Sequence, residues 1–384
     1  MEVFDVGVIG AGIHGVSAAS HLAARGVRVV LVDPLPPAGG PTGRSSAICR
    51  AYYTNTFLAG CARDSIAMFE DFAAATGTSA GFVRTGFLYL HPAEDADGVA
   101  ASAARLRDLG IIVDVVPQDA IAERVPGFDL SGVGFAAFEH GAGYADPHAV
   151  TDGLFRVATR AGVDARIGRS VRRLVTIEPE GAVLHLDDGA EVGCGRVLIA
   201  AGPWTKPLAV QAGADLPLTV ERHVVATFRW GDVEPARAHT DLLAGYYFRP
   251  EGRDLYLVGP TYAAPPVDPD DDVGSIRPDE VEALARAVTA RVPRLVASQV
   301  HGGWASLYDV SPDWQPVIGP VAPGVFVDAG TSGHGFKLAP ALGAHVAAMV
   351  LGDEIDPGLA AFDPKRFAAG TPLAAGYGQN LILG

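Results

Sequence analysis

The chain has 384 residues, of which 49% are hydrophobic and 19% are charged, a composition typical of a globular protein with one large core or two domains. Its formal net charge of −15 argues against a nucleic-acid partner and against binding to an anionic membrane surface. His14, His21 and His345 interrupt the longest apolar stretches, so the sequence predicts no membrane-spanning segment.

The chain opens with the pattern of a strand, a glycine turn and a helix. An apolar run over 3–9 ends at a GxGxxG sequence, and helical periodicity begins directly after it. In this pattern Gly10 allows a tight turn, Gly12 leaves room for a pyrophosphate, and Gly15 lets the helix pack closely on the strand. Because a helix N-terminus favours an anion, the segment predicts a dinucleotide site.

A second strand over 27–32 is followed by Asp33, at the spacing of a carboxylate that accepts hydrogen bonds from an adenosine ribose. An acid at this position would repel a 2′-phosphate. The motif therefore favours NAD or FAD over NADP, and it does not choose between the two.

Residues 34–50 form a loop too long for a plain connection, and loops of this kind usually carry function. The Ser45 and Ser46 hydroxyls are suited to a second phosphate or to the edge of a flavin, and Arg50 is suited to a substrate carboxylate. The alternative is that Ser45 caps the next helix and Arg50 pairs with a surface acid.

Patterns further along the chain alternate between strand and helix. They predict helices over 57–75, 93–109, 148–161 and 278–292, and strands over 86–90, 111–116, 172–177, 182–186, 196–200, 217–230, 242–248 and 255–259. Ala201, Gly202 and Trp204 lie in a glycine turn after one of these strands, which is either a second loop facing the nucleotide or an ordinary turn.

The C-terminal third predicts a strand over 325–329, a glycine-rich turn over 330–337 and a helix over 338–351. This turn places a second helix N-terminus far along the chain from the one at the GxGxxG sequence. Such a helix N-terminus favours a second anionic group. A reduced flavin carries negative charge near N1, whereas an NAD dehydrogenase does not need a second anion site. The turn therefore favours FAD.

The fold class that follows is α/β, with a Rossmann-like nucleotide-binding domain interleaved with a smaller domain of antiparallel sheet and helix. The sequence predicts the first domain over 1–84, 140–216 and 315–384, and the substrate-binding domain over 85–139 and 217–314.

These segments resemble the D-amino-acid oxidase superfamily of FAD enzymes, most closely its sarcosine oxidase and glycine oxidase branch, over nearly the whole chain. The resemblance rests on the GxGxxG with its acid, on the sequences RAYY from Arg50, AGPW from Ala201 and SPD from Ser311, and on GHGFK from Gly333. It implies FAD bound in an extended form. It also implies oxidation of a carbon–nitrogen bond by hydride transfer to flavin N5, giving an imine.

In the sarcosine oxidases, an arginine matching Arg50 and a lysine matching Lys337 hold the substrate carboxylate. Ser306 stands where those enzymes attach the flavin to a cysteine, so the resemblance implies noncovalent FAD. Tyr256 stands where they place a lysine that activates oxygen, and Ala47 stands where they have a second arginine in the same loop. Without the lysine, the electron acceptor is either O2 or another compound.

The candidate catalytic residues are Arg50, Lys337, His334, Tyr256 and Tyr53. The candidate cofactor-binding residues are Gly10, Gly12, Ile13, His14, Gly15, Asp33, Arg44, Ser45, Ser46, Val171, Ala201, Gly202, Trp204, Ser306, Gly333, His334, Gly335, Phe336 and Lys337. His334 has a pKa suited to tuning the flavin, with a structural role as the alternative. Tyrosines are expected to wall the substrate site, and no metal site is predicted.

The expected partner is a small carboxylated amine. Two rivals stay open: an NAD-dependent dehydrogenase and a non-catalytic FAD-binding assembly protein. Three cysteines without a CxxC pair, and the lack of a basic region before the first apolar run, predict reduced thiols and a cytoplasmic location. The sequence does not decide whether the chain forms a homo-oligomer.

Overall fold

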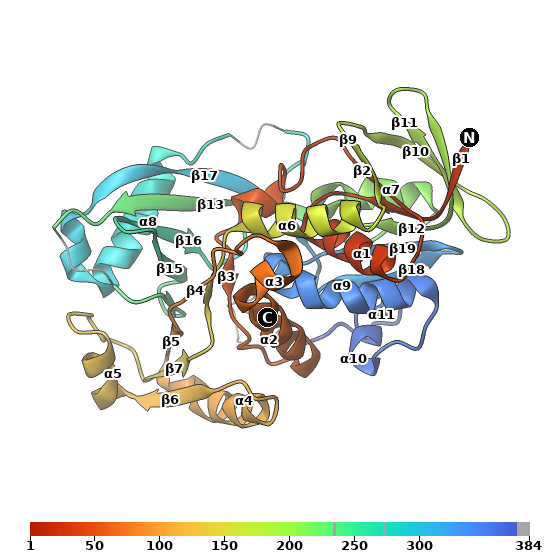
Figure 1. Ribbon diagram of the computed structural model, residues 1–384. Coiled ribbons are helices and arrows are strands. Elements are labelled where there is room, and N and C mark those ends of the chain that lie inside the picture. The colour runs from red at the N-terminus through yellow and green to blue at the C-terminus, as the bar shows by residue number, and fades with distance from the viewer. Residues whose placement is uncertain (233–235, 272–273, 375–384) are drawn as a thin grey trace.

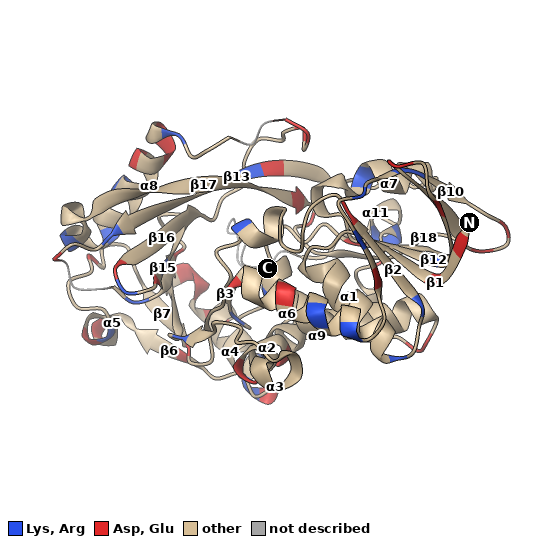
Figure 2. Ribbon diagram, turned by 45° about the horizontal axis from the view of Figure 1, so that its top comes forward, with Lys and Arg blue, Asp and Glu red and all other residues tan. Residues whose placement is uncertain are grey.

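Two eight-stranded sheets and a small three-stranded sheet form the framework of the protein (Figure 1). The computed structural model describes residues 1–232, 236–271 and 274–374. Basic and acidic residues are interspersed along the ribbon (Figure 2). None of the helices in the described part of the chain is long and apolar enough to cross a membrane.

The first sheet is mainly parallel. Its strands are β1 (Glu2–Ile9), β2 (Val29–Asp33), β9 (Asp164–Ile167), β10 (Val171–Thr176), β11 (Ala182–Leu186), β12 (Glu191–Ile199), β18 (Val317–Ala322) and β19 (Val325–Ala329). The parallel strands run in the order β9-β2-β1-β12-β19, and β10, β11 and β18 add antiparallel pairs. Both faces of the parallel part are covered, which explains its continuous apolar runs.

Helices pack on one face of this sheet. They are α1 (Ile13–Ala24), α6 (Pro147–Arg160) and α9 (Gly335–Leu351). Helix α2 (Thr56–Glu70) packs on α9, and α3 (Phe72–Thr76) packs on α6. On the other face, α7 (Thr205–Gln211) and the hairpin of β10 and β11 at the sheet's end pack against residues of the parallel strands. α1 and α9 pack closely, since a side chain at Gly343 would overlap Ser17. Because β1 and β19 are both parallel to β12, the two helices begin at the same edge of the sheet.

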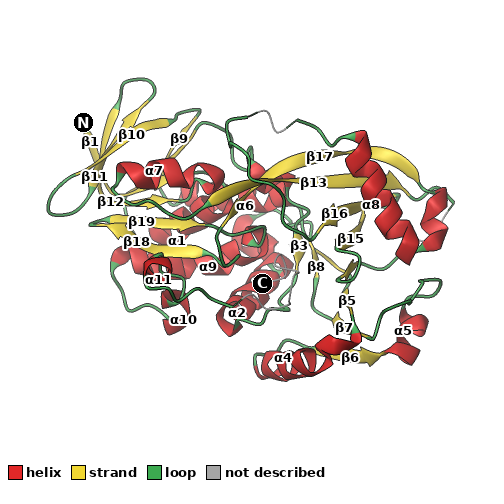
Figure 3. Ribbon diagram, turned by 180° about the vertical axis from the view of Figure 1, so that it is seen from behind, coloured by secondary structure: helices red, strands yellow, loops and turns green. Residues whose placement is uncertain are grey.

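The second sheet has the order β17-β13-β16-β15-β14-β5-β7-β6 and is antiparallel except where β14 pairs with β5. Its strands are β5 (Phe87–His91), β6 (Val113–Pro117), β7 (Phe135–Glu139), β13 (Thr219–Arg229), β14 (His239–Asp241), β15 (Tyr246–Glu251), β16 (Leu255–Pro260) and β17 (Gln299–Val310). Helix α8 (Pro278–Arg291) covers one face, and α4 (Ala96–Asp108) and α5 (Gln118–Arg124) flank β6 (Figure 3).

A small third sheet forms where the chain passes to and from the second large sheet, since β4 precedes β5 and β8 follows β7. It consists of β3 (Ile48–Cys49), β8 (Gly143–Tyr144) and β4 (Val83–Arg84). The short helices α10 (Pro357–Ala360) and α11 (Lys365–Ala368) follow α9. The α/β fold class is confirmed. Every strand of the first large sheet lies within the ranges expected for the nucleotide-binding domain, and every strand of the second lies within the other ranges. The domain boundaries themselves stay a prediction.

Several elements differ from the expectation. The helix over 57–75 is interrupted at Asp71. The strand over 242–248 is a hairpin instead, because the Asp241 carboxylate accepts hydrogen bonds from two backbone N–H groups at 3.0 Å and turns the chain between β14 and β15. Strands β7 and β17 and helix α5 were not expected. In β17, Gly302 and Gly303 weaken the strand pattern in the sequence.

Candidate active site

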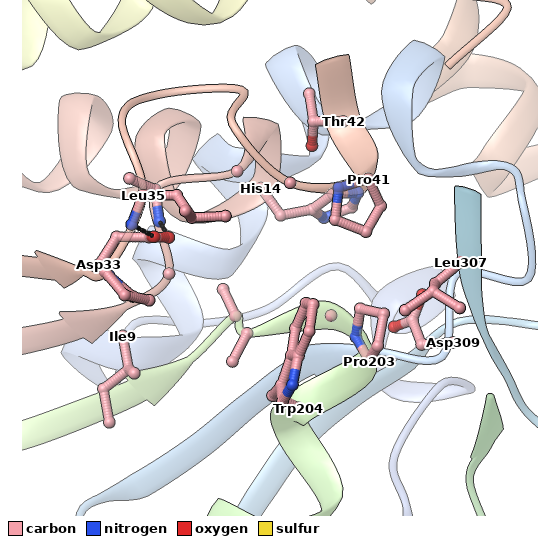
Figure 4. Close-up of a pocket in the computed structure, with 18 of the residues that line it drawn as sticks. Ile9, His14, Asp33, Leu35, Pro41, Thr42, Pro203, Trp204, Leu307 and Asp309 are labelled. Carbon is pink, nitrogen blue, oxygen red and sulfur yellow. Dashed lines mark hydrogen bonds between the residues drawn. The ribbon is translucent and has the colours of Figure 1, made fainter. Parts of the chain in front are cut away.

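A cavity of about 800 Å³ opens where the carboxyl ends of the first sheet's strands meet β17 of the second sheet. Asp33 lies at one end of it, and Leu307 and Asp309 lie towards the other (Figure 4). His14 and Trp204 lie on opposite sides between these ends. The cavity is therefore built by segments from the start, the middle and the end of the chain.

The turn from β1 into α1 has no space for a side chain at Gly10 or Gly15 and is open beside Gly12. Gly10 has φ +113°, and a Cβ atom there would overlap the carbonyl oxygen of Ala200. A Cβ atom at Gly15 would overlap the carbonyl oxygen of Gly10. A Cβ atom at Gly12 would meet only the Thr42 hydroxyl, at 3.1 Å. The turn therefore allows an anionic group to approach the start of α1 closely.

The Asp33 carboxylate fixes this turn from the end of β2. It accepts hydrogen bonds from the backbone N–H of Ala11 at 2.6 Å and of Leu35 at 2.7 Å. Burial raises the pKa of Asp33 above its ordinary value, and these two bonds partly oppose the rise. The same carboxylate lines the cavity, so it is in place to contact a ribose.

The turn before α9 is held against β17 by Asp309. Its buried carboxylate accepts hydrogen bonds from the Gly330 N–H at 2.6 Å and from the Thr331 hydroxyl at 3.3 Å. Gly333 has φ +82°, and a Cβ atom there would lie 2.6 Å from the Tyr308 ring. The start of α9 is therefore packed tightly beside the cavity, with glycine where the chain passes an aromatic ring.

A smaller pocket of about 50 Å³ adjoins this turn. Its lining includes Arg50, which is 4% exposed, and Lys337, which is 6% exposed. The guanidinium of Arg50 lies 4.7 Å from the centroid of the Tyr53 ring, and the Lys337 Nζ lies 6.0 Å from the same centroid. Burial, and then the charge of Arg50, hold the pKa of Lys337 well below its ordinary value.

A buried carboxylate lies close to these two cations. Glu139, at the end of β7, accepts hydrogen bonds from the backbone N–H of Ala51 at 2.7 Å and of Tyr52 at 3.2 Å. It also accepts a bond from the Tyr89 hydroxyl at 3.0 Å. Glu139 therefore fixes the backbone directly after Arg50. Burial raises the pKa of Glu139, and the charge of Arg50 is among the opposing effects.

A family model described as "FAD dependent oxidoreductase" matches residues 5–349. The chain belongs to this family of FAD-dependent oxidoreductases. It is 27% identical to monomeric sarcosine oxidase from Streptomyces avermitilis, over 95% of this chain and 98% of that protein. It is 26% identical to mitochondrial dimethylglycine dehydrogenase from Rattus norvegicus, over 98% of this chain and 47% of that protein, so it spans about half the length of that relative.

Solved structures share the fold of this FAD-dependent oxidoreductase. L-Proline dehydrogenase from P. horikoshii has a TM-score of 0.86 at 24% identity, over 96% of this chain and 99% of that one. Glycine oxidase from Geobacillus kaustophilus has a TM-score of 0.82 at 23% identity, over 95% of this chain and 99% of that one. The resemblance drawn from the sequence motifs is confirmed, and the cofactor is FAD rather than NAD.

The residues of the larger cavity fit FAD. The open side of Gly12 and the Asp33 carboxylate suit the nucleotide half, and the turn before α9 is in place for the flavin half. The buried Ser306 hydroxyl, on β17 one residue from the cavity wall, has no hydrogen-bond partner among the described residues. The three cysteines of the chain are all described and buried, and none lines the cavity, which supports noncovalent binding.

Many of the predicted site residues line one of the two cavities. Those lining the larger cavity are Gly10, Gly12, Ile13, His14, Asp33, Ser45, Val171, Ala201, Gly202, Trp204, Gly333, Gly335 and Phe336. Those lining the smaller pocket are Ser45, Ser46, Arg50, Gly333, Phe336 and Lys337. Their roles towards cofactor and substrate stay predictions.

The alternatives for the loop over 34–50 do not agree with the structure. The Asn55 side chain, not Ser45, caps the next helix by accepting a hydrogen bond from the Leu58 N–H. Ser45 accepts a hydrogen bond from the Ala47 N–H at 3.0 Å. Arg50 is buried and does not lie on the surface, and its guanidinium donates to the Tyr52 carbonyl at 2.9 Å.

The structure corrects the position of Tyr256. Its ring packs between β16 and α8, in an apolar cluster with Phe228 and Trp230, at centroid distances of 5.2 and 4.5 Å. Side chains alternate along a strand, so its neighbours Leu255 and Leu257 project towards the opposite face. Tyr256 is therefore a core residue and lines neither cavity.

Four other predicted residues lie beside the cavities without lining them. The Arg44 side chain is exposed to solvent, and its carbonyl accepts a hydrogen bond from the Trp304 indole at 2.7 Å. Tyr53 and His334 are buried against each other with ring centroids 5.7 Å apart, behind the smaller pocket. Ser306, described above, is buried on β17.

The first helix residue of α9 is Gly335, so Lys337 lies inside its first turn rather than before it.

Sequence reasoning missed Glu139, Asp309, Asp328, Tyr247 and Arg249. Tyr247 lines the smaller pocket, and Arg249 donates to the Ser46 carbonyl at 2.6 Å beside it. The one available signal for Glu139 was an acid at the end of an apolar strand, here β7. The others have no local signature, because their partners come from distant segments.

Replacing Lys337 by methionine should stabilise the substrate-free enzyme by about 1–4 kcal/mol, because a buried amine that lies near the Arg50 guanidinium is removed. The folded chain binds the lysine proton more weakly than the unfolded chain does. The stability of the wild-type protein therefore rises with pH between the depressed pKa and the ordinary lysine pKa. The gain from Lys337→Met should be largest at low pH and vanish above the ordinary value.

Thermal unfolding at several pH values measures this gain. Lys365→Met is the matched control, because Lys365 is exposed and its replacement should not change the stability of the protein at any of these pH values. An unchanged or lower stability of Lys337→Met at low pH would contradict the burial argument.

Proposed function

We propose that this oxidoreductase oxidises a carbon–nitrogen bond of a small carboxylated amine, such as an N-methyl, cyclic or D-amino acid, and releases an imine. The observation that carries the proposal is the meeting of Arg50 and Lys337 in a buried pocket beside the cofactor cavity. Both side chains can donate charge-assisted hydrogen bonds to an anion that enters this pocket, and a substrate carboxylate is such an anion. The names of the relatives, for sarcosine and dimethylglycine, support the same substrate class.

When bound, FAD supplies a hydride acceptor at flavin N5. The residues of this chain then have mainly a positioning role. Arg50 and Lys337 hold the carboxylate, and Phe87, Tyr247 and Tyr308 form walls that exclude water. The pocket of about 50 Å³ supports a small substrate. Buried beside Tyr53, His334 is in place to tune the site without contacting the amine.

A second candidate is a dehydrogenase that passes electrons to an acceptor other than O2. It is favoured by one observation: β16 has no lysine, and its Tyr256 packs on the α8 side of the sheet. A non-catalytic FAD-binding protein is a weaker rival, because such a protein has no need of two buried cations beside the cofactor.

Anaerobic mixing with N-methyl, cyclic and D-amino acids tests the proposal. We expect at least one of them to bleach the flavin absorbance, and the analogue of the same amine without its carboxylate to fail. Reoxidation in air with one peroxide per substrate would identify an oxidase, and slow reoxidation would identify the dehydrogenase. The proposal is wrong if dithionite reduces the flavin and none of these amines does. Release of the flavin on acid denaturation is expected for noncovalent binding.

A further inference from the structure

One histidine bridges the two helices that begin at the cofactor cavity. His14 lies in the first turn of α1, and its Nδ1 lies 3.0 and 2.9 Å from the two carboxylate oxygens of Asp328 on β19. Its Nε2 lies 3.1 Å from the carbonyl oxygen of Gly335, the first residue of α9. His14 and Asp328 both line the larger cavity.

The hydrogen-bond pattern favours the charged form of this ring. A carbonyl oxygen and an ionised carboxylate accept hydrogen bonds and cannot donate them, so each ring nitrogen of His14 must carry a proton to satisfy its partner. The doubly protonated imidazolium is therefore the form that satisfies both partners. It is nearly enclosed, since the His14 side chain is 11% exposed and the Asp328 side chain 1% exposed.

The surrounding charges favour the cation. Burial lowers the pKa of His14, but the charge and the hydrogen bond of Asp328, with a smaller contribution from Asp309 on β17, outweigh burial and raise the pKa above its ordinary value. From α9 the ring meets the Gly335 carbonyl. The Thr42 hydroxyl, from the loop before β3, bonds the neighbouring Ile13 N–H at 3.3 Å.

The bridge restricts how far the start of α1 can move relative to the start of α9. A Cβ atom at Gly335 would lie 2.8 Å from the Nε2 of His14, so the ring packs directly on the backbone of α9. Helix α1 begins at the dinucleotide motif, and α9 begins beside it, at the glycine-rich turn that also lines the cavity. A shift of one start relative to the other would change the span that the cofactor must fill.

We propose that His14 is a positioning residue for FAD: held as an imidazolium by Asp328, it locks the start of α9 to the start of α1 and makes FAD binding depend on pH. This inference rests on the FAD cofactor and on no assumption about the substrate.

The sign of the pH dependence follows from proton linkage. A histidine whose pKa is raised in the folded state contributes fully below its ordinary pKa and loses its contribution as the pH rises through the raised value. The negative pyrophosphate of FAD favours the same protonated form. FAD should therefore dissociate more readily as the pH rises.

The test measures FAD release from the holoenzyme by flavin fluorescence, from about pH 6 to about pH 9, a range that spans the titration of a histidine whose pKa is raised. At the acid end, His14→Gln and Asp328→Asn should each weaken FAD binding by about tenfold to a hundredfold, as expected for the loss of a charged hydrogen bond. The double variant should be no weaker than the worse single variant, because both changes break one bridge. The pH dependence should flatten in all three.

His21→Gln is the matched control. His21 lies on the same helix and also reaches α9, with its Nε2 3.1 Å from the Pro340 carbonyl, and burial lowers its pKa. It has no carboxylate partner within the described residues, so its replacement should leave FAD affinity within about threefold of wild type, an energy difference below that of one ordinary hydrogen bond. Unchanged FAD affinity and pH profile in His14→Gln would overturn the proposal, as would additive effects of the two single changes.

A measurement on the unaltered protein covers the case in which the variants do not fold. Nitrogen-15 NMR of the histidine-labelled holoenzyme reports the protonation of each ring nitrogen. We expect both nitrogens of His14 to carry protons at neutral pH, and His21 to be neutral. A neutral His14 ring at pH 7 would overturn the proposal.

Discussion

Replacing Arg50 by alanine should reduce kcat/KM for a carboxylated amine by a factor that corresponds to about 2–5 kcal/mol, the usual effect of removing one partner of a buried charge pair. The reason is the position of Arg50, buried in the smaller pocket with its guanidinium over the Tyr53 ring. If Arg50 holds the carboxylate before and during the reaction, KM should account for most of the loss.

Steady-state kinetics and flavin content, measured together, check this prediction. Arg286→Ala is the control: Arg286 lies on α8, its side chain is 76% exposed and it lines neither cavity, so kinetics and flavin content should match wild type. Arg50→Lys keeps the charge and loses the planar fork, so we expect an intermediate effect. A normal KM for the carboxylated amine in Arg50→Ala would remove Arg50 from substrate binding.

Replacing Gly15 by alanine should abolish FAD binding and lower the free energy of unfolding by about 3 kcal/mol, the upper end of the range that is typical of an overpacked core. The added methyl group would overlap the carbonyl oxygen of Gly10. This obstacle is backbone and not a flexible side chain, so helix α1 must move away from the β1 turn. That movement changes the place where the pyrophosphate is expected to bind.

The ratio of bound flavin to protein and the midpoint of thermal unfolding measure both effects. Gly60→Ala serves as the control, because Gly60 lies within α2 and no atom would lie within 4 Å of the new methyl group. That change should stabilise the protein by about 0.5–1 kcal/mol through helix propensity. A Gly15→Ala protein with full flavin content and an unchanged midpoint would show that the helix does not need this close approach.

Local patterns were sufficient for the part of the site that is built within a short stretch of chain. Gly10, Gly12, Gly15 and Asp33 belong to one strand–turn–helix–strand unit, and their geometry follows from steric limits and spacing. The turn from Gly330 into α9 could be recognised in the same way. These two segments were enough to predict the fold class and FAD.

Contacts between distant segments could not be predicted in this way. The bridge from His14 to Asp328 joins residues 314 positions apart, and the Glu139 carboxylate bonds backbone groups 88 and 87 positions away. No local pattern encodes such partners, because several acids were equally available to each donor in the sequence. Arg50 and Lys337 were paired by family resemblance, and the fold brings them into one pocket.

Tyr256 shows the limit most clearly. The sequence by itself determined that Tyr256 lies in a strand, and the family resemblance suggested that it faces the flavin. Only the tertiary structure decided which side of the sheet it faces. The physical reason is the two-residue period of a strand: a shift of one residue in register reverses every side chain, and the register is set by pairing with β13 and β15 rather than by the strand itself.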